Sequence, residues 1–368
     1  MMSEYLGFPS SDADVKLLMQ AIDTDSTGTI SFDEFTNYVG AVGGSMKLFE
    51  VRRCSIGDRL GRTGSGSFVD DPEGLRMALL SAAIDEDAQA YWRLVVSPSE
   101  FVEAAKLRTC QQKAVAHIRR LSKANHDKAL PELQRKVARL GHQDTDLWLT
   151  LAWIREMAPI ILHLDLDKML QFLEKDTHYR NQFETKSSGG LLNLDVRKRW
   201  EKDLFGGCYD KAEPSEKCKY GVLNVMNDHR GVVKCKQYGE SYLVVKDARL
   251  RCTFSPEDSA NLKAERLAVL DFYAHVLNEY SDSELKETLK VAISKDAALL
   301  GDSASVGNMK YKETQIHGDV CFKTHVERLV AHTKHRETSG MEARLRALAA
   351  KHGWSFSWMD EEQERMKK

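Results

Sequence analysis

The pattern of apolar and polar positions changes near Pro159. Before this residue, apolar side chains recur at helical spacing, with helix breaks predicted near Asn125, Pro131 and Gly141. After it, short apolar runs typical of strands are interleaved with further helical segments. The sequence therefore predicts a helical region followed by an α+β region.

The second region is expected to hold several short elements. The predicted strands cover residues 160–164, 221–225, 231–236, 242–245, 248–254 and 310–317. The predicted helices cover residues 167–173, 262–279, 283–293, 323–331 and 341–351. Glycines and charged turns separate the strands, which favours a sheet built from short segments.

The most specific motif is a run of oxygen-bearing side chains at residues 23–34. A calcium-binding loop of about 12 residues needs oxygen ligands at alternate positions, glycine at the sixth position and glutamate at the twelfth. Gly28 and Glu34 stand at those two positions. The predicted Ca²⁺ ligands are the side chains of Asp23, Asp25 and Thr27, the backbone carbonyl of Thr29, Ser31 directly or through water, and both carboxylate oxygens of Glu34.

Both flanks of this loop have helical apolar spacing, for example Leu18 and Ile22 before it and Phe35 and Val39 after it. With these flanks, residues 11–40 resemble an EF-hand. The resemblance implies that the loop binds Ca²⁺. The alternative interpretation is an Asp-rich turn that binds no ion.

EF-hands usually occur in pairs, so the resemblance implies a partner for the first hand. We predict a second, degenerate hand near residues 75–105. From Asp85 to Glu100 this segment has 16 positions, and Ala90 stands at the sixth. We expect it to pair with the first hand without binding an ion tightly. Two amphipathic helices joined by a loop remain the alternative, and a Gly-rich linker at 41–74 separates the two segments.

Several polar blocks in the second region are denser than core packing requires. They are YRNQFET at 179–185, RWE at 199–201 with FGGCYD at 205–210, KYGVLN at 219–224, TFSPEDS at 253–259 and ETQIHG at 313–318. In this order the blocks resemble a bacterial family of uncharacterised domains over about residues 160–335. Lys186 departs from the glycine that is usual there, and the resemblance implies no settled activity.

The blocks supply groups that enzymes use, namely a cation to bind anions, carboxylates for acid–base work, and amides and hydroxyls that orient a substrate. The candidate catalytic residues are Arg180, Glu184, Ser255, Glu313, Gln315 and His317. One hypothesis is transfer or hydrolysis at a phosphate-bearing or NAD-like substrate. The spaced arginine, serine and Glu-x-Gln segments are similar to ADP-ribosyltransferases, which usually carry Gln-x-Glu or Glu-x-Glu. The alternative is a set of buried polar networks that hold the fold.

Histidines suggest two further sites. His163, Asp165 and Asp167 could form a metal cluster, but we favour a polar strand face in which Asp167 caps the next helix. Residues 325–336 hold three histidines beside basic residues, where we favour a solvated helix end over a zinc site.

Composition narrows the class of protein. The 368 residues allow two or three domains, and 53 Lys and Arg against 55 Asp and Glu give a net charge of −2. A net charge this close to zero creates no overall positive electrostatic potential that would attract nucleic acid, so no nucleic-acid partner is expected. We expect no membrane span and no secretory signal from this sequence. Its seven cysteines are scattered along the chain and are expected to be reduced thiols. Together these features predict a cytoplasmic location.

We therefore predict a multidomain protein with an all-α EF-hand region and a helical spacer followed by an α+β domain. The expected boundaries are 1–106 for the EF-hand region, 107–158 for the spacer, 159–336 for the α+β domain and 337–368 for a helical tail. The expected function is Ca²⁺ binding that regulates the C-terminal domain or a protein target. An enzyme with a calcium-sensing appendage and an interaction scaffold are the alternatives.

Overall fold

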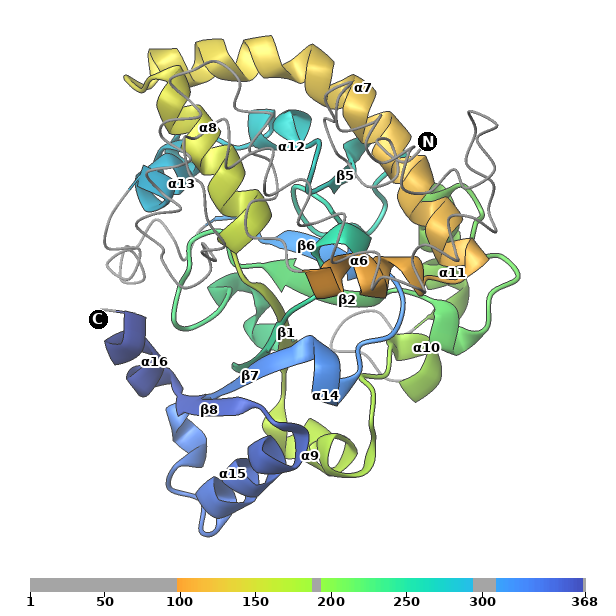
Figure 1. Cartoon of the computed structure of the whole chain (residues 1–368), viewed down its shortest axis with the longest axis vertical. Coiled ribbons are helices and arrows are strands. Elements are labelled where there is room, and N and C mark those ends of the chain that lie inside the picture. The colour runs from red at the N-terminus through yellow and green to blue at the C-terminus, as the bar shows by residue number, and fades with distance from the viewer. Residues whose placement is uncertain (1–97, 187–192, 294–308, 367–368) are drawn as a thin grey trace, which may run out of the picture. The chain divides into compact units, whose positions relative to one another are not determined.

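A computed structural model describes residues 98–186, 193–293 and 309–366 (Figure 1). The chain divides into two compact units, Met1–Ala105 and Lys106–Lys368. In the first unit the described part is the helix α6 (Pro98–Ala105). The expected calcium loop at 23–34, the Gly-rich linker at 41–74 and most of the degenerate hand lie outside the described residues.

The second unit is built on a mixed sheet of eight described strands in the order β5-β4-β6-β2-β1-β3-β7-β8. Neighbouring strands are antiparallel, except that β7 and β8 are parallel. The strands are β1 (Ile160–Leu164), β2 (Lys219–Leu223), β3 (Ser241–Val245), β4 (Cys252–Phe254), β5 (Ala268–Val269), β6 (Lys312–Ile316), β7 (Val326–Ala331) and β8 (Ser355–Trp358). Helices together with this sheet confirm the predicted α+β character.

Helices surround the sheet (Figure 1). The α-helices are α7 (Thr109–Arg139), α8 (Asp144–Ala152), α9 (Leu166–Lys175), α10 (Gln182–Thr185), α11 (Leu194–Phe205), α12 (Ala274–Asn278), α13 (Asp282–Ile293), α14 (Phe322–His325), α15 (Met341–His352) and α16 (Met359–Met366). A π-helical turn, η3 (Trp153–Met157), follows α8, and short 3₁₀ turns include η5 (Val233–Tyr238) and η10 (Thr333–His335).

The two faces of the sheet have different surroundings, because side chains alternate along each strand. Ile160 and Leu162 of β1 join a large apolar core with residues of α7, α8, α9, α12, α13 and α15. Ile161 points to the other face, where a smaller cluster includes Val222, Tyr242 and Cys235 of η5. The segment containing η5 therefore covers the central strands on the face opposite to the main core.

Helix α7 runs for 31 residues without the predicted breaks at Asn125 and Pro131. Proline removes one backbone N–H and crowds the carbonyl four residues earlier, which here belongs to Asp127. Pro131 and Asp127 are both exposed, so water can solvate the carbonyl that loses its helical partner. The predicted break near Gly141 is confirmed, since that residue has a φ of 86° after the helix.

The residues expected to form a spacer and a tail belong to the same compact unit as the sheet. Leu133 and Val137 of α7 and Leu147 and Leu151 of α8 are buried in the main core. At the other end, β8 pairs with β7, and Trp358 is buried. The unit that holds the α+β fold thus extends from residue 106 to residue 368.

Three predicted elements of the second region are wrong. Residues 231–236 contain a 3₁₀ turn in place of a strand, and residues 323–331 form mainly β7 in place of a helix. Residues 262–279 form a turn, β5 and the short helix α12. Short buried apolar runs do not distinguish a helix from a strand, because both faces are covered.

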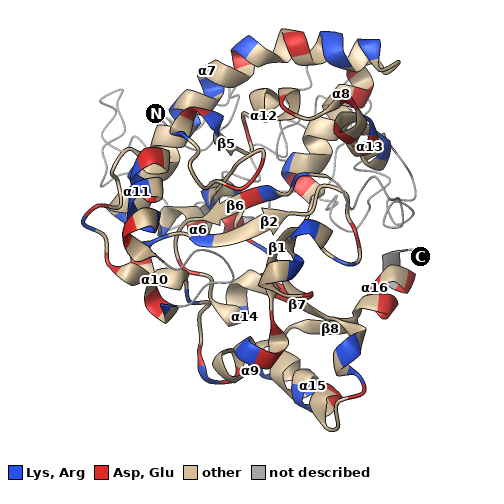
Figure 2. Ribbon diagram, turned by 180° about the vertical axis from the view of Figure 1, so that it is seen from behind, with Lys and Arg blue, Asp and Glu red and all other residues tan. Residues whose placement is uncertain are grey.

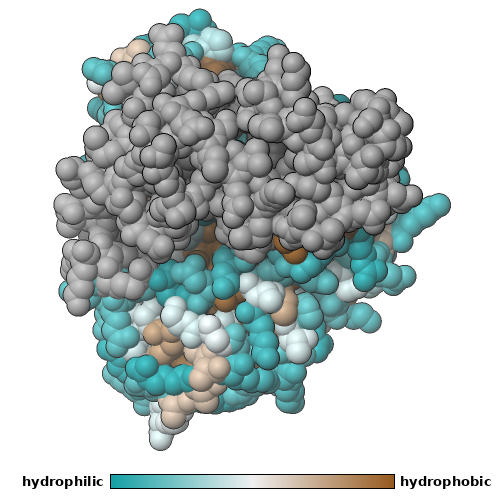
Figure 3. All heavy atoms as spheres, in the orientation of Figure 1, coloured by the Kyte–Doolittle hydropathy of each residue, from teal (hydrophilic) through white to brown (hydrophobic). Residues whose placement is uncertain are grey.

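On the face shown in Figure 3, the surface of the described residues is mainly hydrophilic and has small hydrophobic patches. Lys113, Lys123 and Lys128 of α7 are exposed. Blue segments, which mark Lys and Arg, recur along this helix in Figure 2. Among the described helices, none combines the length and the apolar character needed to cross a membrane.

Gly239 occupies a position that other residues cannot take, and we expect Gly239→Ala to destabilise the fold severely. Its φ is 131°, and an added Cβ would lie 1.9 Å from the backbone carbon of Leu164. Because that atom belongs to the backbone of β1, we expect a loss of more than about 3 kcal/mol in the free energy of unfolding, measured by urea denaturation. Gly141→Ala is the matched control, since Gly141 also has positive φ but open space around it, and we expect a loss of about 1 kcal/mol. Equal losses in the two variants would contradict this account.

Candidate functional site

Polar side chains gather on the sheet face opposite to the main core, where β6 lies between β2 and β4. Glu313 and Gln315 are two residues apart on β6 and therefore point to the same face. The register places Glu313 opposite Val222 and Gln315 opposite Tyr220. Sequence alternation within ETQIHG predicts this shared face.

The Glu313 carboxyl is buried and held by uncharged donors. Ser259 donates its hydroxyl hydrogen bond to Oε1 of Glu313, and the amide of Gln315 donates to the same oxygen at 3.3 Å. Burial raises the pKa of Glu313 to about 7, and the negative charge of Asp258 acts in the same direction. A carboxyl group that exchanges its proton near neutral pH is suited to general acid–base catalysis.

A chain of hydrogen bonds fixes the orientation of Gln315. The Thr253 hydroxyl donates to Oε1 of Gln315 at 2.9 Å and contacts Nε2 of His317 at 3.1 Å. Since the hydroxyl has one hydrogen, Nε2 of His317 is the donor in the second contact. Nδ1 then accepts from the Tyr209 hydroxyl at 2.6 Å.

His317 is a positioning residue in this chain. Burial lowers the pKa of His317 to about 3, with the charges of Arg251 and Lys219 adding to the effect. The imidazole is therefore neutral at physiological pH, and both ring nitrogens are engaged. Its hydrogen bonds connect the residue that follows β6 to Thr253 of β4 and to Tyr209, so that the chain from His317 to Glu313 is held in one arrangement.

Two tyrosines near Glu313, Tyr238 and Tyr311, are more exposed than Glu313 itself. Tyr311 and Tyr238 are partly buried, and Tyr311 donates a hydrogen bond to Oδ2 of the exposed Asp258 at 2.5 Å. A hydrogen bond also joins the two tyrosines. Burial and the bond to Asp258 raise the pKa of Tyr311. A substrate that reaches Glu313 from this side would meet aromatic surfaces and a carboxylate.

Ser255 takes part through its backbone. Its N–H donates to the Glu313 carbonyl oxygen at 2.9 Å, while its hydroxyl donates to the Glu257 carbonyl oxygen at 2.6 Å. The serine that contacts the Glu313 carboxylate is Ser259, four residues later in the same block. The sequence identified the right block but gave no signal that distinguishes the two serines.

Arg180 and Glu184 have structural contacts elsewhere. Arg180 pairs with Asp176 at 2.5 Å, and its guanidinium carbon lies 5.8 Å from the Phe172 ring centroid. Glu184 accepts a hydrogen bond from the backbone N–H of Asn181 at 2.9 Å and so caps α10. The structure thus unites Glu313, Gln315 and His317 with the backbone of Ser255, and it gives Arg180 and Glu184 other partners.

His163 binds the segment that carries η5. Its Nδ1 donates to the Gly239 carbonyl oxygen at 2.8 Å, and its Nε2 accepts from the Val232 N–H at 3.0 Å. Burial lowers the pKa of His163 to about 4, which keeps the ring neutral. The residue that caps α9 is Asp165, which accepts from the Asp167 N–H, so the predicted cap at Asp167 is wrong. In the described ranges no group of three or more His, Cys, Asp or Glu side chains is arranged to hold a metal ion.

The three histidines at 325–336 do not end a helix of the predicted length. His325 is the last residue of α14, and its Nδ1 accepts from the Cys321 N–H at 2.8 Å. His332 follows β7 and caps the turn η10 by accepting from the Lys334 N–H. These histidines organise backbone turns at the two ends of β7.

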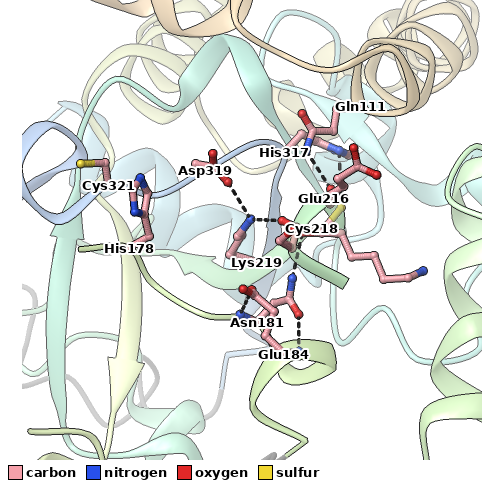
Figure 4. A network of polar contacts seen from close by, with 12 residues as sticks. Gln111, His178, Asn181, Glu184, Glu216, Cys218, Lys219, His317, Asp319 and Cys321 are labelled. Carbon is pink, nitrogen blue, oxygen red and sulfur yellow. Dashed lines mark hydrogen bonds and ion pairs between the residues drawn. The ribbon is translucent and has the colours of Figure 1, made fainter. Parts of the chain in front are cut away.

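Buried lysines are the polar groups that the sequence did not reveal. Lys219 donates to the Ser215 carbonyl oxygen at 2.8 Å and lies 3.6 Å from Oδ1 of Asp319 (Figure 4). Lys312 lies 3.8 Å from the Tyr280 ring centroid, and burial lowers its pKa to about 8. Lys219 begins one polar block and Lys312 directly precedes another, and both lie in strands of the sheet. This position in the sequence is the feature from which their burial could have been predicted.

Comparison with protein families gives one match. The profile of a family described as "Protein of unknown function (DUF3626)" matches residues 162–364. No curated protein matches the chain. The matched range contains Glu313 and every side chain of its cluster named above. It confirms the expected likeness to an uncharacterised family and extends it beyond residue 335.

The burial of Glu313 predicts a pH-dependent difference between the wild type and Glu313→Gln. Because the folded pKa of about 7 exceeds the unfolded value of about 4.3, the native state binds more protons between these limits, and stability falls as pH rises through them. The glutamine has no proton to lose. We expect the free energy of unfolding of the variant to gain up to about 3 kcal/mol relative to the wild type between pH 4 and pH 8, measured by urea unfolding. A constant difference across this range would contradict the prediction.

Proposed function

The chain belongs to the DUF3626 family, and we propose that its family domain is an enzyme in which Glu313 is the reacting carboxyl group. The observation that supports this most directly is the surroundings of the buried Glu313 carboxyl. Ser259 and Gln315 are uncharged donors to it, Asp258 is a neighbouring acid, and no described cation forms an ion pair with it. A structural acid in a protein interior is normally paired. An acid held near its neutral form is a recurring feature of active sites.

The chemistry that fits is hydrolysis at a glycosidic carbon of a phosphate-bearing substrate such as NAD, in which the base leaves, water forms the new bond to the ribose carbon and its proton passes to solvent. Such cleavage passes through an oxocarbenium-like state, which an ionised carboxylate stabilises. The bond between nicotinamide and ribose in NAD is of this type. Glu313 would face the ribose, while Gln315 and Ser259 would hold Oε1 of the Glu313 carboxyl. Tyr238 and Tyr311 would offer aromatic surface to a planar ring. The Glu-x-Gln strand is similar to the strand of ADP-ribosyltransferases but places Gln315 where that family usually carries a glutamate, so the assignment rests on the surroundings of Glu313.

A second function rests on a separate observation, the complete ligand pattern at residues 23–34. We propose that this loop binds Ca²⁺ and that the ion regulates the family domain. In EF-hands, ion binding changes the angle between the flanking helices and exposes apolar side chains. Phe35 and Val39 would be such side chains here.

Glu313→Gln tests the proposed enzyme. We incubate the purified full chain with NAD labelled in the nicotinamide ring and measure nicotinamide release. The amide cannot become an anion, so we expect turnover to fall at least about 100-fold while NAD affinity changes little. Glu184→Gln is the matched control, because Glu184 caps α10, and it should retain turnover. Absence of both binding and turnover in the wild type would remove NAD as the substrate, and equal turnover in Glu313→Gln would remove the role of Glu313.

Calcium titration tests the N-terminal loop. We expect the full chain to bind one Ca²⁺ with roughly micromolar affinity, measured by isothermal titration calorimetry. The double variant Asp23→Ala with Glu34→Gln removes the first ligand and the bidentate ligand, so binding should be lost. Asp33→Asn is the control, since Asp33 is not at a ligand position, and it should bind nearly as the wild type does. Two tight sites would contradict the degenerate second hand, and no binding would contradict the first.

A further inference from the structure

A band of cations runs along the exposed side of α7. The helix contains eight Lys and Arg residues and two Asp and Glu residues, a net charge of +6 (Figure 2). Six of these cations are exposed and form no ion pair with another described residue. They are Lys113, Arg120, Lys123, Lys128, Arg135 and Arg139. The near-neutral charge of the whole chain, from which no nucleic-acid partner is expected, therefore hides a strongly positive face.

The two remaining cations of α7 show how a charge that serves the fold is neutralised. Arg119 pairs with Asp271 at 2.6 Å. Lys136 donates to the carbonyl oxygens of Asn278 and Tyr280. The six exposed cations have no such partners among the described residues, and like charges along one helix repel one another. A ligand that supplies negative charge along the helix would offset this repulsion.

Helical geometry fixes where the six cations lie. Each residue advances about 1.5 Å along the axis, so Lys113 and Arg139 are about 39 Å apart. With 3.6 residues per turn, Lys123 lies near one edge of the exposed side and Lys128 near the other. Ala116, Ala124 and Ala138 are also exposed, so that a ligand can approach the helix closely between the charges. The face is therefore long and charged along both edges.

The surroundings of α7 favour nucleic acid over a membrane surface. A helix that lies on a membrane buries apolar side chains among the lipids. The apolar side of α7 is already used, because Ile118, Leu133 and Val137 are buried within the domain. The large hydrophobic residues that are exposed in the described part of the chain are Val102 and Met157, and neither lies in α7.

The width of a helix favours DNA over RNA. An α-helix with its side chains is about 10–12 Å wide, and the major groove of B-DNA is about 12 Å wide. The major groove of duplex RNA is too deep and narrow for side chains to read. In B-DNA the phosphates border the groove on both sides, which matches cations along both edges of the face.

We propose that the exposed face of α7 binds double-stranded DNA, with the helix in the major groove and its cations on the phosphates of both strands. Lys and Arg form charge-assisted hydrogen bonds to phosphate oxygens. Because the buried side of α7 is fixed in the domain, the helix loses little entropy on binding. Contacts to phosphates position a protein without reading bases, so the binding is independent of base sequence. This proposal does not rest on the proposed enzyme.

Salt-dependent DNA binding by the purified full chain tests the proposal. A labelled duplex of about 20 base pairs is longer than the face, which spans about 11 base pairs. We measure its affinity by fluorescence anisotropy in EDTA, so that no divalent ion bridges protein and DNA. For four to six phosphate contacts, we expect the logarithm of the association constant to fall with the logarithm of salt concentration with a slope of about −3.6 to −5.4.

Two variants of the face should change the affinity in opposite directions. Lys128→Gln combined with Arg135→Gln should weaken DNA binding at least about tenfold and make the slope shallower by about 2, since two phosphate contacts are lost. Asp127 is an exposed acid on the same side of the helix. Asp127→Asn should strengthen binding about threefold, because it removes a negative charge near the phosphates.

Lys234→Gln combined with Lys236→Gln is the matched control, since it removes two exposed lysines from η5, outside α7. We expect its affinity to stay within about twofold of the wild type, because screening weakens charges outside the contact. No DNA binding by the wild type at low salt, equal losses in the two double variants, or weaker binding by Asp127→Asn would overturn the DNA site. Tighter binding to duplex RNA, polyglutamate or phosphatidylserine vesicles than to DNA would overturn DNA as the ligand.

Discussion

The hydrogen-bond chain from His317 to Glu313 is the interaction on which the polar face of the sheet depends. It joins Glu313 and Gln315 of β6 to His317, which follows the strand, through Thr253 of β4, and it ends at the Tyr209 hydroxyl. Each member has one donor or acceptor role, because the Thr253 hydroxyl gives its single hydrogen to Gln315 and so leaves Nε2 of His317 as a donor and Nδ1 as an acceptor. A sheet that buries polar side chains on one face needs such complete pairing, since an unmade hydrogen bond in the interior costs about 1–3 kcal/mol.

The sequence predicts the parts of this arrangement that depend on local periodicity. Alternation places Glu313 and Gln315 on one face of a strand, and β1 begins and ends at the predicted residues. It does not predict which distant residue completes each contact. Ser255 and Ser259 stand in the same block, and their roles are decided by how the loop after β4 returns toward β6.

Tertiary contacts also override local preferences elsewhere. The run around Val326 is compatible with a helix, yet it forms β7 because strands lie on both sides of it. Pro131 is tolerated within α7 because its side of the helix faces water. Arg180 and Glu184 come from a polar block, and their contacts in the structure are with Asp176 and with the backbone N–H that begins α10, away from Glu313. A single sequence does not reveal which members of a block will meet.

The other buried acids of the domain show why Glu313 differs. Glu201 pairs with Lys217 at 2.7 Å, Asp271 with Arg119 at 2.6 Å, and Asp228 with Arg230. In each pair a cation offsets part of the cost of removing the carboxylate from water. The burial of Glu313 is offset by no such cation among the described residues, and the nearby Asp258 raises the cost further. Burial raises the pKa of Glu201 and of Asp228 as well, but each of these acids has a cation beside it, whereas Glu313 has a neighbouring carboxylate. A buried carboxyl without a cation, with a pKa of about 7, can gain or lose a proton near neutral pH, which is what a catalytic carboxyl requires.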